Sequence, residues 1–186
     1  MPLSDHVKKD SPTNNFPTLN QLTTTRASLS NGNLRVNGGS SGQGYLIPSI
    51  LLPKTGKWYW EVLVTAVGYE TQIGLWKTSY QVTDENANPM GQNSGNSAYI
   101  YYAYNGNLYH AGSNESFGQS YTSGDLISNI FDADSLEYTV YKNNDTSNSA
   151  TKTVTDEQYA PVLQWREING ANDLSINLGQ DHLFGG

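Results

Sequence analysis

The sequence predicts an all-β fold in which two antiparallel sheets stack as a sandwich. Apolar residues recur at every second position in several short stretches, whereas no stretch keeps the helical spacing of i, i+3, i+4 and i+7 over three turns. Gly, Asn, Ser and Thr separate these stretches, and the dipeptide Asn-Gly, which suits tight hairpin turns, recurs along the chain. Many short strands joined by such turns are typical of an antiparallel sandwich or barrel.

The chain has 186 residues, which is enough for a single domain with a substantial core. Residues 1–15 are a polar lead-in with little to bury, so we place one domain at residues 16–186. The first predicted element is a tight hairpin at residues 29–36, where apolar residues flank Asn31-Gly32.

The remaining predicted elements are strands recognised by their alternation. In Trp58 to Val64, the side chains of Trp58, Trp60, Val62 and Val64 share one face. The other predicted strands lie at residues 72–76, 98–104, 126–132, 136–142, 161–165 and 174–178. Asp132 to Ser135 should form the hairpin connection between two of them, because Asp and Ser favour turns.

Composition argues against several classes of function. With 17 Asp and Glu against 10 Lys and Arg, the formal net charge is −7, which disfavours a nucleic-acid-binding surface. The chain has no cysteine, and its three histidines are widely spaced, so we expect neither a metal site nor a cofactor. No apolar run approaches the roughly 20 residues of a membrane-spanning helix, so membrane insertion is not expected.

Three blocks of sequence, in order along the chain, resemble a known family. They are GKWYWEV with the IGLWK that follows, GDLISNIFDADSLEYTVYKNN, and SINLGQD, and the resemblance covers about residues 45–186. These blocks are similar to those of the SPRY domain family, with Leu178 where the family usually has Phe. The resemblance implies a concanavalin A-like jelly roll, and a non-catalytic module that binds protein or peptide through loops at one end of the sandwich.

A shorter stretch, DSPTNNF at residues 10–16 with the TLNQL and SNGNL that follow, resembles the variant of this family found in structural proteins of tailed phages. It implies a virion domain in a tail fibre, a tail-associated protein or a capsid decoration, made in the host cytoplasm and extracellular after assembly. The expected partners are a protein or glycan on the host surface, for attachment, and other virion proteins. Homo-oligomerisation and a purely structural assembly role stay open as alternatives.

Three carboxylates, at Asp132, Asp134 and Glu137, are the strongest catalytic candidates. Laminarinase-like glycoside hydrolases share the concanavalin-type sandwich, and their Glu-x-Asp-x-x-Glu set lies on one strand. A retaining hydrolase needs two carboxyl groups about 5–5.5 Å apart. Here the first residue is the shorter Asp, and the segment is predicted to be a turn. We therefore predict no catalytic residues, and keep a glycan-cleaving depolymerase as the alternative.

Aromatic and polar residues in the connections between strands are the best candidates for a contact surface. Tyr offers large, rigid contact area at low entropic cost, and Trp and Arg are enriched at binding hot spots. Tyr99 and Tyr101 are expected in the core instead, with their hydroxyls at its edge. The predicted ligand-binding residues are Tyr69, Glu70, Tyr80, Tyr104, Asn105, Tyr109, Trp165 and Arg166.

Overall fold

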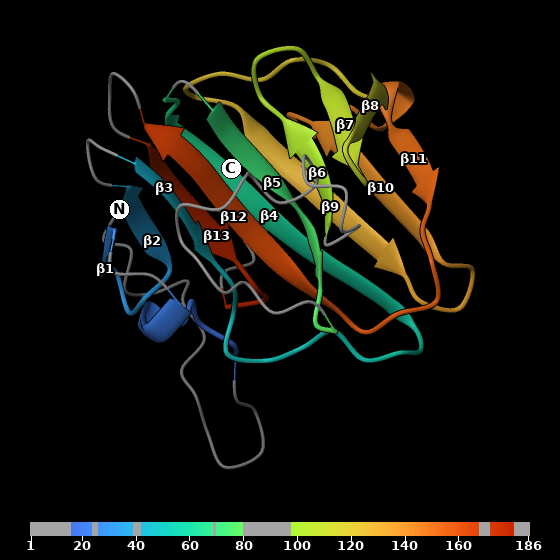
Figure 1. Ribbon diagram of the computed structural model, residues 1–186, viewed down its shortest axis with the longest axis horizontal. Helices are drawn as coiled ribbons and strands as arrows, with labels where there is room; N and C mark the ends of the chain where they lie inside the picture. The colour runs from blue at the N-terminus through green and yellow to red at the C-terminus, as the bar shows by residue number, and fades with distance from the viewer. Residues whose placement is uncertain are drawn as a thin grey trace.

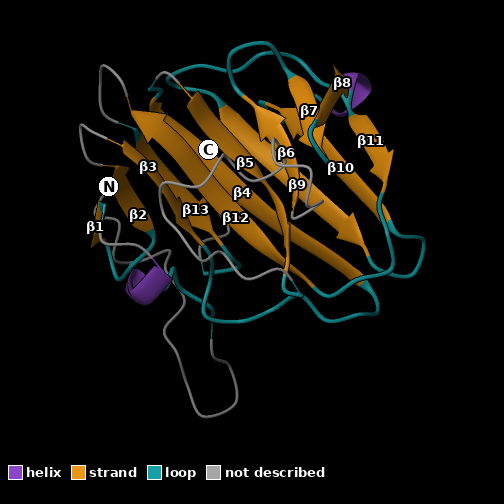
Figure 2. Ribbon diagram, in the orientation of Figure 1, coloured by secondary structure: helices purple, strands orange, loops and turns teal. Residues whose placement is uncertain are grey.

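The computed structural model describes residues 16–23, 26–38, 42–68, 70–79, 98–167 and 172–180. Within these ranges the regular secondary structure is almost entirely β-strand, as Figure 2 shows, with two short 3-10 helices at η2 (Gln21–Thr23) and η3 (Thr146–Asn148). The strands form two antiparallel sheets, so the predicted two-sheet sandwich is confirmed. The lead-in predicted at residues 1–15 lies outside the described residues.

One sheet has seven strands, in the order β1-β2-β13-β4-β9-β10-β11. Their bounds are β1 (Ala27–Ser30), β2 (Arg35–Gly38), β13 (Asp173–Asn177), β4 (Lys57–Ala66), β9 (Leu126–Asp132), β10 (Glu137–Lys142) and β11 (Ala150–Thr153). The central strand β4 pairs with β13 on one side and with β9 on the other.

The second sheet has six strands, in the order β3-β12-β5-β6-β7-β8. Their bounds are β3 (Gly42–Leu46), β12 (Tyr159–Glu167), β5 (Glu70–Lys77), β6 (Ala98–Tyr102), β7 (Asn107–His110) and β8 (Ser113–Ser116). In Figure 1 the strands of both sheets run along the same diagonal, which is the aligned packing expected of two twisted sheets.

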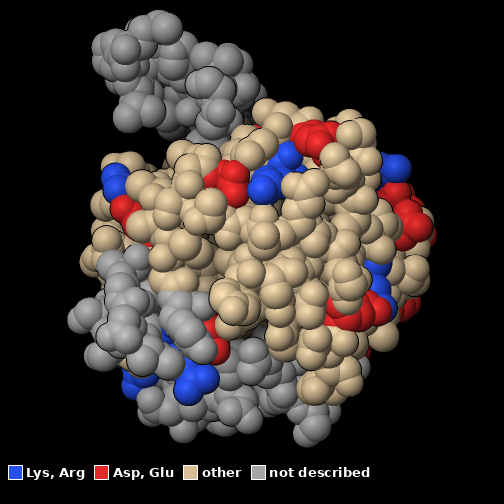
Figure 3. Space-filling view, turned by 90° about the horizontal axis from the view of Figure 1, so that it is seen from above, with Lys and Arg blue, Asp and Glu red and all other residues tan. Residues whose placement is uncertain are grey.

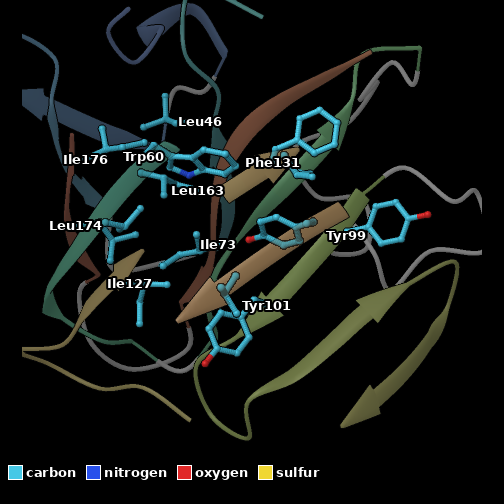
Figure 4. Close-up of a cluster of buried hydrophobic side chains, with 14 of the residues drawn as sticks. Leu46, Trp60, Ile73, Tyr99, Tyr101, Ile127, Phe131, Leu163, Leu174 and Ile176 are labelled. Carbon is cyan, nitrogen blue, oxygen red and sulfur yellow. The ribbon is translucent and has the colours of Figure 1, made fainter. Parts of the chain in front are cut away.

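The core lies between the sheets and follows the predicted alternation. From β4, Trp60, Val62 and Val64 are buried in the same cluster as Ile73 and Leu75 of β5. Figure 4 shows Trp60 and Ile73 in this cluster. Trp58, predicted on the same face, is only partly buried, because it lies at the start of β4 and its indole N–H donates to the Thr55 carbonyl at 3.0 Å.

The prediction that Tyr99 and Tyr101 belong to the core is confirmed, since each is 2% exposed. Their hydroxyl groups form hydrogen bonds with different segments at the edge of the core. The Tyr99 hydroxyl accepts a hydrogen bond from the Thr155 amide at 3.2 Å, and the Tyr101 hydroxyl donates to the carbonyl of Gln119. Each phenol therefore fills apolar space while its polar atom finds a backbone partner, as a buried Tyr requires.

Trp165 of β12 fills the space between the sheets beside two glycines. Its side chain is 1% exposed. A Cβ atom added at Gly38 of β2 would lie 2.9 Å from its Nε1, and one added at Gly44 of β3 would overlap its six-membered ring. One glycine comes from each sheet, so the two layers close around the indole only because these positions have no side chain.

The first hairpin differs in detail from its prediction. Strands β1 and β2 do pair, with Ser30 opposite Arg35, but four residues connect them instead of two. Asn31, Gly32 and Asn33 all have positive φ. Leu34 packs against the core, and its carbonyl accepts the Ile176 amide of β13 at 2.8 Å. Leu34 therefore lies in the connection, partly buried, and not in a strand.

The first and last described segments lie against each other. The Gln180 side-chain amide donates to the Pro17 carbonyl at 2.5 Å. A Cβ atom at Gly179 would lie 3.6 Å from the Phe16 ring. The Leu19 amide then donates to the Asn33 carbonyl at 3.0 Å, and Leu19 itself is buried in the core. Residues 16–20 and 177–180 are thus joined on one side of the sandwich.

Candidate functional site

A pocket of about 360 Å³ opens at one end of the sandwich. We call it the rim pocket. Its lining includes Val67, Ala103, Tyr104, Tyr121, Asp125 and Lys142. These residues come from three connections, β4–β5, β6–β7 and β8–β9, and from the end of β10. Figure 3 looks down on this end, where charged groups lie scattered in an otherwise uncharged surface and opposite charges lie side by side.

Hydrogen bonds between the connections fix the walls of the rim pocket. The Val67 amide donates to the Ser123 hydroxyl at 3.1 Å, which joins the β4–β5 and β8–β9 connections. The Tyr121 hydroxyl is buried and lies 3.0 Å from the Tyr101 carbonyl and 3.3 Å from that of Thr71. Burial raises the pKa of Tyr121, so its hydroxyl stays neutral and remains a donor.

An ion pair forms the polar part of the pocket. The Lys142 ammonium lies 3.6 Å from the Asp125 carboxylate and donates to the Ser120 carbonyl at 3.2 Å. Asp125 also accepts the Thr122 amide at 2.8 Å and the Asn143 side-chain amide at 2.7 Å. The Asp125 carboxylate thus bonds an amide of the turn before it as well as pairing with Lys142. Because Lys142 and Asp125 are bonded within the protein, they help to fix the shape of the pocket.

Tyr104 is the large aromatic residue of the rim pocket, and it is 79% exposed. It was predicted from sequence as a contact residue, and the structure places it on the pocket wall. Asn105 follows it and is exposed, with its side-chain oxygen accepting the Asn107 amide at 3.0 Å. This bond shapes the β6–β7 connection and so positions Tyr104.

Glu70 and Arg166 lie at the same end of the sandwich, on the first residue of β5 and near the end of β12. They are opposite each other in the sheet register, and Arg166 Nη1 lies 3.6 Å from Glu70 Oε1. Their side chains face away from the core, on the outer side of the six-stranded sheet. Tyr109 lies on that same outer side, in β7, where its ring packs edge-to-face against Tyr102 at 5.2 Å.

The prediction of Trp165 as a contact residue is wrong. It assumed that Trp165 begins a connection, whereas β12 continues to Glu167 and the period of two directs Trp165 inward with Leu163. Tyr69 and Tyr80, the other two predicted contact residues, lie outside the described residues.

Val67, Tyr121 and Lys142 were not predicted from sequence as pocket residues. Lys142 looked like the end of a strand before the turn at Asn143-Asn144, and both asparagines do adopt positive φ. The turn at Asn143-Asn144 lies beside Gly124-Asp125, because Asn143 Oδ1 accepts the Leu126 amide at 2.8 Å. Recognising that these two turns lie together would have placed Lys142 near Asp125.

The carboxylates of Asp132, Asp134 and Glu137 lie in and beside the β9–β10 turn, as predicted. Asp132 Oδ1 accepts the amides of Asp134 at 3.1 Å and Ser135 at 3.2 Å. Asp134 accepts the Gly56 amide at 3.0 Å. Glu137 is the first residue of the next strand. Asp132 and Asp134 are thus occupied in holding the turn together.

Acid should weaken this turn. Hydrogen bonding to Lys57, 2.9 Å away, and then to the Ser135 amide holds the pKa of Asp132 below its ordinary 3.8. A lowered folded-state pKa adds stability above about pH 4, and this stability is lost as pH falls through the lowered value. We expect Asp132→Asn to flatten the fall of the melting temperature between about pH 4 and pH 2. Asp156→Asn is the control, since that side chain is 76% exposed, and an equal flattening would contradict the prediction.

Among the described residues, no group of three or more His, Asp or Glu side chains is arranged to hold a metal ion. In the same part of the chain, no helix has the length and apolar character needed to cross a membrane.

Comparisons with known proteins agree with this geometry. No curated protein sequence matches the chain. The SPRY domain of human HERC1 superposes with a TM-score of 0.71 at 20% identity, covering 87% of this chain and 98% of that one. A second human SPRY domain gives 0.64 at 19% identity, covering 83% of this chain and 96% of that one. The SPRY domain family itself matches residues 57–181, from β4 to just beyond β13, and this chain therefore belongs to it.

Proposed function

We propose that this chain is a non-catalytic binding module of a tailed-phage virion, which takes a protein on the host surface at its rim pocket. SPRY domains are in general protein-binding modules, which supports a protein partner. The resemblance of residues 10–16 to tailed-phage structural proteins supports the virion and the host-surface target.

The proposal depends on one observation: the exposed ring of Tyr104 lies beside a pocket whose walls are fixed by hydrogen bonds. A hot-spot residue is commonly a large aromatic side chain next to a well-packed pocket. Tyr104 keeps most of its surface exposed, while the neighbouring Lys142 and Asp125 are already paired. A partner can therefore bury the ring and enter the pocket without removing an unpaired charge from water.

We expect Tyr104→Ala to weaken binding of the partner about tenfold or more, the loss typical of a hot spot. The partner is sought with the purified chain on an array of host-envelope proteins and glycans, and its affinity is then measured by titration. Tyr59→Ala is the matched control, because Tyr59 is 48% exposed and lies on β4, away from the rim pocket. It should leave the affinity unchanged.

Two results would contradict the proposal. Equal binding by the two variants would mean that the partner uses another surface. If the chain binds no molecule on the host array but forms a stable complex with another virion protein, a purely structural assembly role would be favoured.

A further inference from the structure

Asn-Gly pairs occur three times in the described part of the chain, at Asn31-Gly32, Asn37-Gly38 and Asn105-Gly106. All three asparagines are exposed, but the backbone amides of the glycines that follow them differ in their bonding. This difference matters because the backbone nitrogen that follows an asparagine can attack that residue's own side chain. Glycine, which has no Cβ, hinders such an attack least. The fourth pair, at residues 169–170, lies outside the described residues.

Backbone hydrogen bonds hold the amides of Gly38 and Gly106. The Gly38 amide donates to the Asn172 carbonyl at 2.9 Å, at the end of β2, a strand that pairs on both sides. The Gly106 amide donates to the Tyr102 carbonyl, also at 2.9 Å. The Asn105 side chain is engaged as well, because its oxygen accepts the amide two residues further on. An amide bonded in this way can attack only after its hydrogen bond breaks.

Asn31 and Gly32 lack these restraints. Among the residues that the structure describes, neither the Gly32 amide nor the Asn31 side chain has a hydrogen-bond partner. Both residues are exposed in the connection between β1 and β2, and a Cβ atom added at Gly32 would have no atom within 4 Å. The Leu34 amide lies 3.1 Å from the Ser30 carbonyl and 3.3 Å from that of Asn31. Rotation of the Asn31-Gly32 peptide therefore leaves the shorter of these two bonds in place.

We infer that Asn31 is a site of spontaneous deamidation, and that the fold protects the other two asparagines. The Gly32 amide nitrogen loses its proton to base and forms a bond with Asn31 Cγ. The bond from Cγ to the side-chain nitrogen breaks, and this nitrogen leaves as ammonia with a proton taken from water. Water then adds to either carbonyl of the resulting cyclic imide and breaks one of its ring C–N bonds. The products are aspartate and isoaspartate, each of which adds one negative charge to the chain.

This modification site does not depend on the function proposed for the rim pocket. Strand β2 begins at Arg35, beside the connection that contains Asn31, and ends at Gly38. The partner of Gly38, Asn172, also accepts the amide of the pocket residue Gly68 at 3.0 Å. Asn31 thus lies at the end of β2 that is remote from the rim pocket, and its deamidation should leave binding there unchanged.

The test incubates the full, folded chain in mildly alkaline buffer and digests samples with trypsin over time. Cleavage after Arg26 and Arg35 isolates Asn31 in residues 27–35, and Asn37 and Asn105 fall in two other peptides, so mass spectrometry follows each site separately. We expect Asn31 to deamidate about tenfold faster, or more, than Asn37 and Asn105. A tenfold ratio corresponds to about 1.4 kcal/mol of barrier, close to the net value of one backbone hydrogen bond.

Unfolding the chain in guanidinium chloride supplies the control, because it removes the protecting hydrogen bonds and keeps the three Asn-Gly sequences. The three rates should then become similar. In the folded chain, Asn31→Gln should suppress the acidic species that accumulates on ion exchange, since the longer side chain closes a larger ring more slowly. The inference is overturned if Asn31 deamidates no faster than Asn37 and Asn105 in the folded chain, or if Asn31→Gln accumulates the acidic species at the original rate. It is also overturned if the difference between sites persists in denaturant, because the local sequence would then be its cause.

Discussion

Replacing Trp165 with alanine is expected to lower the free energy of unfolding by about 3–5 kcal/mol, the usual loss for a large buried aromatic side chain. The indole is 1% exposed and fills the space between Gly38 of one sheet and Gly44 of the other. Neither glycine has a side chain that could fill the resulting cavity. Denaturant titration followed by tryptophan fluorescence or circular dichroism measures the loss.

Trp58→Ala is the matched control, because Trp58 is a tryptophan that is only partly buried, at the start of β4. Its loss of stability should be clearly smaller. An equal loss for the two variants would mean that burial between the sheets is not what makes Trp165 important.

A double-mutant cycle tests the fit between the indole and Gly44. Gly44→Ala alone should destabilise the protein, because its Cβ would overlap the Trp165 ring. Overpacking of this kind costs about 1–3 kcal/mol. In the Trp165→Ala background the same methyl enters empty space, so its cost should disappear and the two effects should not add. Strict additivity would show that the close approach is relieved elsewhere.

Gly106→Ala should lower the free energy of unfolding by roughly 2–5 kcal/mol, the combined effect of backbone strain and overpacking. Gly106 has φ +71°, and a Cβ there would overlap the Gly118 carbonyl, a backbone atom that cannot rotate away. The Gly106 carbonyl also accepts the Gly118 amide at 2.9 Å, so the added methyl separates two connections that form this end of the sandwich.

Gly32→Ala is the control, with a similar φ of +63° and no atom within 4 Å of the added methyl. It should cost only about 1–2 kcal/mol, from the left-handed backbone alone. Thermal unfolding of the two variants gives the comparison. Because Gly106 lies two residues after Tyr104, its variant should also weaken partner binding. Similar losses of stability in the two variants would contradict this account.

Strands with several apolar residues in alternation were predicted from sequence. Strand β4 shows the alternation plainly because Trp60, Val62 and Val64 are buried while the residues between them are more exposed. Four strands were missed as separate elements: β3, β7, β8 and β11. Strand β8, Ser-Asn-Glu-Ser, is exposed throughout and forms one edge of its sheet, so no apolar pattern reveals it. Its position follows from its pairing with β7, which the sequence pattern does not show.

The candidate site was harder to predict, because proximity at one end of a sandwich depends on strand order. Tyr104 was found as an aromatic residue in a connection, which is a local property. Lys142 and Val67 became pocket residues only because β10 ends and β4 ends at the same rim.

The contact between residues 16–20 and 177–180 has a consequence for how such a domain can be attached to a carrier. A polypeptide that enters near Phe16 and leaves near Gln180 returns almost to its starting point. A domain joined to its carrier through these positions would project as a side branch, and tension along the carrier would bypass most of its strands. Insertion of residues 16–180 into a surface loop of an unrelated protein should thus leave both partners folded, since adjacent ends favour domain insertion.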